Sequence, residues 1–287
     1  MNKISFASFV LLIILSLQAN CQDFDMNAVN KIRNEGFNNS RVMDIAFHLT
    51  DASGPRLTAS PGFKRAANWA KDEMIKMGLK NVAIVPWGEF GQGWEQTRSY
   101  VAMTSPYYVP LIAIPRAWTG STPGSTIIES QLLVIKAKDS AELYNNYTGK
   151  IAGRAVLIYS TDTLKPSFMA DGERLADTSL LKMANALPPV PRPQNAANPT
   201  TPNPQMDGFR QRQAYQRSLM NFFKNEKPAI VLSMSRAGND GTLFVQNGGA
   251  YTKDAENNFA WVMLSSDDYL RIQRLSESGI PVKIEAD

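Results

Sequence analysis

The sequence predicts an α/β protein with a helical N-terminal part and a β-rich second part flanked by helices. Three observations predict this fold class. Apolar residues recur at helical spacing over residues 61–77, and continuous apolar runs of strand length follow at 155–159 and 229–233. Between these regions lies the segment 120–125 (GSTPGS), whose turn-forming composition marks a junction. The length of 287 residues suits one large domain or two ordinary ones.

The composition is that of a globular protein. Hydrophobic residues make up 44% of the chain and charged residues 20%. The formal net charge is +4, and the lysines and arginines are scattered along the chain. Nucleic-acid binding proteins carry clustered basic residues, so the sequence predicts no nucleic-acid partner.

Residues 1–21 are predicted to be a secretory signal peptide. Lys3 supplies a basic start, residues 4–17 are mostly apolar, and polar residues follow. The apolar run is too short and wrongly flanked for a stable membrane span, so we expect no transmembrane segment after cleavage. Cys21 is the only cysteine. Lipidation at Cys21 is an alternative, but Asn20 fits poorly where such a site needs a small residue. Cleavage would leave no thiol, which suits a secreted, periplasmic or cell-surface bacterial protein.

The first half is predicted to contain three helices and a few strands. The helices are expected at 25–35, at 41–51 with residues 38–40 as its cap, and at 61–77. Ser60 is a good N-cap for the third, Pro61 fits its first position, and Gly78 fits its C-terminal cap. Its apolar stripe is expected to consist of Phe63, Ala67, Ala70, Met74 and Met77.

Strands are expected at 82–87 and 98–104, separated by a Gly-rich turn at 88–94. The apolar run 107–114 is punctuated by Pro106, Pro110 and Pro115, which favours strands at sheet edges.

The second half is predicted to contain strands at 131–137, 155–159, 229–233, 242–246, 261–264 and 280–284, a helical turn at 140–144, and helices at 207–226 and 267–278. Residues 187–206 are Pro- and Asn-rich and predict an extended loop, with a proline-rich recognition site as the less favoured alternative. Residues 239–241 (NDG) predict a hairpin turn.

The residues taken alone show no complete active site. A zinc site needs three or four His, Cys, Asp or Glu ligands, and His48 is the only histidine. Lying beside Phe47 and Leu49, it is expected to be packed or partly exposed rather than a ligand. There is no GxSxG segment for a Ser-His-Asp triad. We therefore assign no catalytic, cofactor-binding or metal-binding residue.

Several charged groups have ordinary explanations. Asp267 and Asp268 open a predicted helix, where capping explains them. The spacing of Asp171, Glu173 and Asp177 fits no known cation-binding loop. Four basic residues of the predicted helix 207–226 are expected to lie on a solvated face rather than form an anion site: Arg210, Arg212, Arg217 and Lys224.

A resemblance to a known family emerges from the motifs and their order. GPRLTAS, the following PGFKRAANWAKDEMIKMGLKNV and then VPWGEFGQGW resemble the start of M28 family zinc exopeptidases, closest to the branch that includes carboxypeptidase Q. The family pattern is Gly-Pro-Arg-Leu-Thr-Gly-Ser, so Ala59 replaces its second glycine. GKIAGRAVLI, EKPAIVLSMSRAGNDGT and SSDDYLRIQRLSESGIPVKIEAD resemble a protease-associated (PA) domain. The resemblance implies a peptidase segment at 22–125 and a PA domain at 126–287, which contains the loop 187–206.

The resemblance implies an exopeptidase acting on short peptides at a centre of two zinc ions. In such centres metal-bound hydroxide attacks the carbonyl and a Glu acts as general base. The family's ligands lie after the inserted domain, beginning with a His-Xaa-Asp segment that this sequence lacks. The expectation is therefore the front part of a longer enzyme, which alone binds no zinc and hydrolyses no peptide. Whether the whole enzyme is an amino- or a carboxypeptidase stays open.

Two alternatives are non-enzymatic. Receptor-like relatives of the family keep the fold without metals, and a free-standing PA domain would bind peptides or partner proteins. Against the latter, six apolar residues are expected to contact an element that this chain lacks: Phe63, Trp69, Met74, Trp87, Phe90 and Trp94. Arg56 is expected to make a structural salt bridge, with a place at the substrate rim as the alternative.

Overall fold

The computed structural model describes residues 25–164, 168–170, 172–188, 204–235, 243–246, 248–256 and 258–287. The signal peptide with Cys21, most of the loop 187–206, Asp171 and the turn 239–241 lie outside the described residues. The chain forms two compact units. Unit 1 comprises the residues up to Gly54 together with Arg65–Ile84, and unit 2 comprises Pro55–Lys64 together with Val85–Asp287.

Unit 1 is helical, as predicted. It contains α2 (Met26–Asn38), α3 (Val42–Leu49) and most of α4 (Pro61–Lys76). The Asp25 side chain caps α2 by accepting from two backbone N–H groups. Of the expected cap of α3 at residues 38–40, Ser40 Oγ accepts from the Val42 N–H at 3.4 Å. The N-cap position itself is Arg41, which makes no side-chain cap bond.

Helix α4 begins and ends as its sequence predicts. The backbone N–H of Phe63 donates to Ser60 Oγ at 3.1 Å. Gly78 has φ 91°, and the N–H groups of Gly78 and Leu79 donate to the carbonyls of Ile75 and Met74. This pair of bonds is the Schellman motif, which satisfies two terminal carbonyls.

The predicted apolar stripe of α4 is not the buried face of the helix. Phe63, Met74 and Met77 are 45%, 45% and 53% exposed, whereas Ala66 and Glu73 are buried at 6%. The helix therefore packs through a face rotated from the apolar stripe. Its buried face holds a carboxylate because Arg41 of the α3 N-terminus reaches it.

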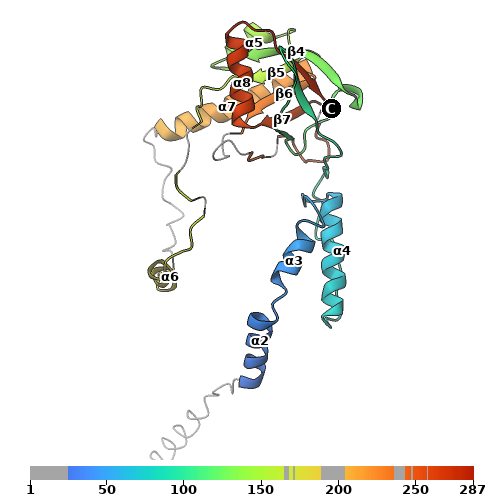
Figure 1. Ribbon diagram of the computed structural model, residues 1–287, viewed down its shortest axis with the longest axis vertical. Coiled ribbons are helices and arrows are strands. Elements are labelled where there is room, and N and C mark those ends of the chain that lie inside the picture. The colour runs from blue at the N-terminus through green and yellow to red at the C-terminus, as the bar shows by residue number, and fades with distance from the viewer. Residues whose placement is uncertain are drawn as a thin grey trace, which may run out of the picture. The chain divides into compact units, whose positions relative to one another are not determined.

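Unit 2 is built on one eight-stranded sheet, shown in Figure 1. Its strands are β1 (Val101–Ser105), β2 (Val109–Pro110), β3 (Ala113–Pro115), β4 (Ile128–Ile135), β5 (Ala155–Ile158), β6 (Ile230–Met234), β7 (Ala260–Leu264) and β8 (Lys283–Ala286). The order is β2-β1-β8-β4-β5-β6-β7-β3. Strands β4 to β7 are parallel, and the remaining pairs are antiparallel.

The proline argument for edge strands is confirmed, because β2 and β3 are the two edges of this sheet. Two expected strands are wrong: residues 82–87 and the described residues 243–246 form none. The expected domain junction at residue 125 lies within unit 2, beside the short 3-10 helix at Pro123–Ser125. The assignment of the two sides to a peptidase segment and a PA domain stays a prediction.

Helices cover both faces of the sheet of unit 2. On one face α8 (Ser266–Glu277) places Tyr269 and Ile272 against alternate residues of β5, β6 and β7. On the other face α5 (Ser140–Tyr147) and α7 (Pro204–Glu226) place Leu143, Phe222 and Phe223 against the intervening residues. The α/β class is thus confirmed. Helix α6 (Asp177–Ala184) was not expected from the sequence.

The Gly-rich segment 88–94 makes backbone contacts within unit 2. A Cβ on Gly91 would lie 2.0 Å from the carbonyl oxygen of Tyr251, and one on Gly93 would lie 2.4 Å from that of Ala59. The Phe90 ring stacks on Tyr251 at 4.7 Å, and Trp94 Nε1 donates to the Thr119 carbonyl. Phe90 and Trp94 are therefore partnered inside unit 2, contrary to the expectation of an absent neighbour.

Ala59 adopts a left-handed backbone conformation, with φ 61°. This conformation costs an L-residue roughly 1–2 kcal/mol, whereas glycine adopts it freely. We predict that Ala59→Gly raises the free energy of unfolding by about 0.5–1 kcal/mol after the entropy of the unfolded glycine is subtracted. Urea denaturation followed by circular dichroism measures this. Ala67→Gly inside α4 is the control and should lower stability by about 1 kcal/mol. An Ala59→Gly variant no more stable than the parent chain contradicts the assignment.

The contact at Gly93 yields a second prediction. Gly93→Ala should lower the free energy of unfolding by about 1–3 kcal/mol, because the added methyl forces two backbone segments apart. Gly88→Ala is the matched control, since nothing lies within 4 Å of its added Cβ. If both substitutions change the denaturation midpoint equally, the close approach of Gly93 and Ala59 is refuted.

Candidate functional site

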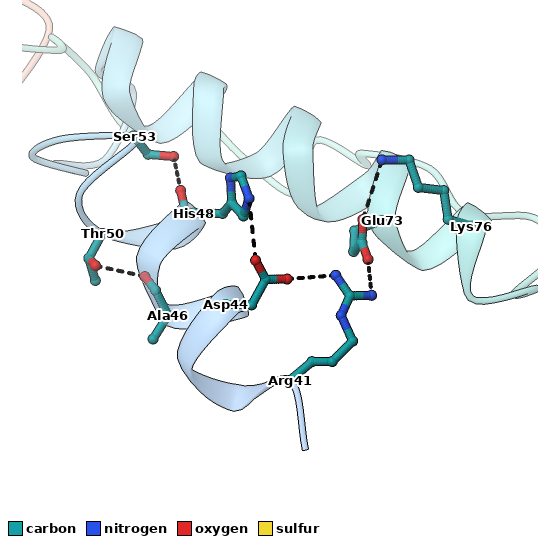
Figure 2. A network of polar contacts seen from close by, with 8 residues as sticks. All are labelled: Arg41, Asp44, Ala46, His48, Thr50, Ser53, Glu73 and Lys76. Atoms are coloured by element: carbon teal, nitrogen blue, oxygen red, sulfur yellow. Dashed lines mark hydrogen bonds and ion pairs between the residues drawn. The ribbon is translucent and has the colours of Figure 1, made fainter. Parts of the chain in front are cut away.

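The only histidine lies in a polar network of unit 1, shown in Figure 2. Arg41 donates to Glu73 Oε1 at 2.5 Å and to Asp44 Oδ2 at 2.6 Å. Lys76 Nζ lies 3.4 Å from the second oxygen of Glu73. His48 Nε2 lies 3.6 Å from Asp44 Oδ1. The network joins α3 to α4.

Glu73 is the centre of this network. It is 6% exposed, on the buried face of α4. The hydrogen bond from Arg41 lowers the pKa of Glu73, although partial desolvation opposes that shift. The same contacts, with Asp44 first, raise the pKa of Arg41. The pair therefore stays charged over the neutral range and acts as a clamp between two helices.

His48 is packed and partly exposed, as the sequence predicts. Its ring stacks on Trp69 at a centroid distance of 4.7 Å with an interplanar angle of 15°. Its side chain is 36% exposed. Trp69 is thus partnered by His48, which corrects the expectation that it contacts an absent element. A second helix-to-loop contact lies nearby, where Ser53 Oγ donates to the His48 carbonyl and Arg65 donates to the Ser53 carbonyl.

Asp268 does more than cap a helix. Ser265 Oγ accepts from the Asp268 N–H, so Ser265 is the N-cap of α8 as predicted. The Asp268 carboxylate is 6% exposed and accepts from the backbone N–H of Ile112 at 2.8 Å. It therefore also fastens the segment between β2 and β3 to α8. The sequence does not predict this contact, because Asp268 and Ile112 are far apart in the chain.

The remaining charged candidates are exposed or half-buried. Arg210, Arg212 and Arg217 of α7 are exposed and Lys224 is half-buried, which agrees with a solvated face. Glu173 and Asp177 are exposed, with Asp177 in the first turn of α6. Arg56 is exposed in the loop before α4.

The described residues do not fit a zinc centre. No group of three or more His, Cys, Asp or Glu side chains is placed there to hold a metal ion. His48 has Asp44 as its one nearby carboxylate among the ion pairs of the described part. Of the described helices, none combines the length and the apolar character that crossing a membrane requires.

Apolar side chains are exposed on both α3 and α4 of unit 1. On α3, Met43 is 78% exposed and Phe47 51%. On and just after α4, Ile75 is 51% exposed and Leu79 56%, alongside the exposed methionines of the predicted stripe. Both helices thus carry large apolar side chains that no described residue buries.

The described residues of unit 2 line cavities that the sequence did not predict. One of about 370 Å³ lies where Trp94, Arg98 and Thr119 meet the first residues of β6 and β7, and Arg98 forms an ion pair with Asp287 at 2.7 Å beside it. Another, of about 190 Å³, lies at the carboxyl ends of β5, β6 and β7 beside Arg116. Arg116 is a single basic residue among apolar ones, and no motif in the sequence marks it. The sequence therefore did not predict the cavity beside it.

Comparison with known proteins gives limited similarity. No family model and no curated protein matches the sequence. Among solved structures, a peptidase M28 precursor from Shewanella amazonensis SB2B has a TM-score of 0.49 and 16% identity, over 92% of this chain and 50% of that one. BSAP, a zinc aminopeptidase from Bacillus subtilis, has a TM-score of 0.41 and 10% identity, over 85% of this chain and 42% of that one. The chain thus spans half or less of the length of these neighbours. Both TM-scores are too low to establish a shared fold.

The Arg41–Glu73 clamp predicts an acid-sensitive unit 1. The pKa of Glu73 is lower in the folded than in the unfolded state. Its ionised carboxylate therefore contributes fully to the free energy of unfolding above the unfolded pKa of about 4.3. This contribution is lost as the pH falls through the folded-state pKa. We expect Glu73→Gln to lower the melting temperature at neutral pH and to reduce its fall on acidification. Circular dichroism melts across the acid range measure this. Glu35→Gln, at an exposed position of α2, should leave both quantities unchanged. Identical profiles for Glu73→Gln and the parent chain would show that the clamp does not stabilise unit 1.

Proposed function

We propose that this chain is the non-catalytic N-terminal and inserted part of a secreted M28-like zinc exopeptidase of the carboxypeptidase Q-like branch. In this proposal the two zinc ions, the general base and the peptide substrate belong to a catalytic segment outside this chain. The chain alone is inactive. It supplies the Gly-Pro-Arg loop, helix α4 and a PA domain.

The loop before α4 carries the proposal. The family pattern has glycine at the position of Ala59, and Ala59 is one of the few non-glycine residues with positive φ here. The left-handed backbone at this position explains why the family pattern has glycine there, because glycine adopts positive φ without a steric cost. The neighbouring Ser60 then caps α4, and Gly93 of the second motif packs against the Ala59 carbonyl. The two motifs that carry the resemblance therefore also meet in space within unit 2.

The exposed faces of α3 and α4 support the same proposal. A helix stripe of apolar residues is normally buried against another layer. Here the buried face of α4 is the one held by Arg41 and Glu73, and the apolar residues Met74 and Met77 point elsewhere. We propose that this surface packs against the catalytic sheet of the whole enzyme.

The second candidate function is a non-enzymatic interaction protein. The observation that favours it is the self-contained core of unit 2, in which helices cover both faces of the sheet. In that case a longer reading frame would carry the catalytic domain with its ligand positions substituted.

Two measurements test the proposal. The purified chain should show no zinc-dependent exopeptidase activity on short peptides, and the coding DNA beyond codon 287 should continue into a His-Xaa-Asp segment. Activity of the chain alone contradicts the proposal. A continuing frame with substituted ligand positions supports the interaction protein instead.

A hydrophobic dye tests the exposed surface of unit 1. We expect the chain to bind an environment-sensitive dye strongly, and the double variant Met74→Gln, Met77→Gln to reduce that fluorescence while the helix content stays unchanged. Met183→Gln on α6 is the control for a methionine of comparable exposure, 62%, outside unit 1. Dye binding that the double variant does not reduce would contradict an open packing surface on α4.

A further inference from the structure

The larger cavity of unit 2 lies beside the first residues of β1, β6 and β7. Its volume of about 370 Å³ falls in the range of small-molecule sites, which is about 300–1,000 Å³. Its floor consists of side chains of the apolar core: Val101, Ile230, Ala260 and Val262. The segments 94–99 and 119–125 supply most of its wall. The cavity therefore combines an apolar floor with a polar wall.

Hydroxyl groups dominate the polar wall. Several lining residues have a hydroxyl without a hydrogen-bond partner among the described residues: Thr97, Ser99, Ser121, Thr122 and Ser125.

Thr122 is the most informative of these residues, because it is only 8% exposed. A buried hydroxyl is normally paired, since an unpaired one costs free energy. The neighbouring Thr119, which is 7% exposed, follows this rule, because its hydroxyl donates to the Arg116 carbonyl at 2.7 Å. The hydroxyl of Thr122 therefore indicates a partner that enters the cavity.

The charged groups of the lining are already engaged. Arg98 Nε lies 2.7 Å from Asp287 Oδ2. Two backbone hydrogen bonds with Tyr100, of 2.9 and 3.0 Å, hold Asp287 in place. Glu95, the other charged residue of the lining, is exposed and has an interaction partner too. The wall thus offers a ligand neutral hydrogen bonds rather than a charge.

Trp94 adds an aromatic surface to the wall. Its indole N–H donates to the Thr119 carbonyl at 3.0 Å, which fixes the side chain before any ligand arrives. A side chain that is already ordered loses little entropy on binding. Trp94 is half-buried, so part of its surface stays open to a ligand.

The ligand that fits this lining has hydroxyls on its rim and C–H groups on its faces. Ser and Thr hydroxyls both donate and accept hydrogen bonds, so they match the hydroxyls of a sugar. The aromatic and aliphatic side chains match the C–H faces of a sugar ring. A purely aliphatic ligand would leave the hydroxyls of the wall unpaired. An anion would compete with Asp287 for Arg98.

We propose that this cavity binds a neutral carbohydrate, with sugar hydroxyls on Ser121 and Thr122 and a C–H face on Trp94. The chemistry fits a free hexose or the end unit of a longer glycan. This inference does not depend on the peptidase proposal.

The test is an NMR titration of the full chain with the methyl glycosides of glucose, galactose, mannose and N-acetylglucosamine. The indole N–H resonance of Trp94 reports binding, because this side chain lines the cavity. Trp87, which is 97% exposed and lies outside the lining, is the internal control. We expect at least one glycoside to shift the Trp94 resonance saturably and to leave the Trp87 resonance unchanged. If none of the glycosides does so, the proposal is overturned.

Two analogues test the chemistry of recognition. Tetrahydropyran-2-methanol keeps the sugar ring but lacks its ring hydroxyls, and should bind at least about tenfold more weakly than the best glycoside, because the wall hydroxyls stay unpaired. Methyl glucuronide should bind no more tightly than methyl glucoside, because Arg98 is already paired with Asp287. Equal affinity for the pyran, or tighter binding of the charged sugar, contradicts a neutral carbohydrate ligand.

Variants assign the binding to the cavity. Thr122→Val replaces the buried hydroxyl by a methyl group of the same shape, and should weaken binding about three- to tenfold. Ser121→Ala changes an exposed position of the wall, and is expected to weaken binding even if Thr122→Val does not fold. Thr161→Val is the matched control, since Thr161 is exposed and outside the lining. Unchanged affinity in Ser121→Ala, or equal weakening by Thr161→Val, refutes the site.

A last arm distinguishes the two sources of the sugar. The same titration is run with the methyl glycoside of the β-linked disaccharide of the best-binding hexose. Tighter binding of the disaccharide supports the end unit of a glycan as the ligand, whereas equal or weaker binding supports a free hexose.

Discussion

The structure of unit 2 depends on the burial of β5, β6 and β7 on both faces. Val156 and Val231 face α5 and α7, whereas Leu157 and Leu232 face α8. A parallel sheet exposes apolar residues on both sides, so it is stable only with helices on each face. The edges can then be short, and β2 and β3 are short and rich in proline. The same arrangement places the ends of three strands at one rim, where the cavity beside Arg116 lies.

Unit 1 is held together differently from unit 2, because its helices α3 and α4 are joined by a polar clamp rather than by an apolar core. Neither α2 nor α3 buries a residue. The contact that joins α3 to α4 is Arg41 with Glu73, supported by the stacking of His48 on Trp69. A charged pair with one exposed partner contributes little stability by itself. Unit 1 therefore owes its arrangement to polar and aromatic contacts rather than to a buried apolar core.

Part of this architecture could be predicted from local chemistry. The ends of α4 and α8 were predictable, since Ser60, Gly78 and Ser265 satisfy backbone groups within one helical turn. The buried strands β5, β6 and β7 were predictable from continuous apolar runs. Spacing located the apolar stripe of α4 but not the buried face of the helix, because burial depends on which neighbour is present. The strand expected at 82–87 does not form, because a strand also needs a neighbouring strand to pair with.

By itself, the sequence determined the α/β class, the helix caps, the edge strands and the lack of enough histidine and cysteine for a zinc centre of the family type. Each of these follows from composition or from interactions between near neighbours in the chain. Only the tertiary structure decided the left-handed conformation of Ala59, its contact with Gly93, the tie between Asp268 and Ile112, and the cavity of Arg116. These features join residues that are distant in sequence, so their physical cause is the packing of one segment on another.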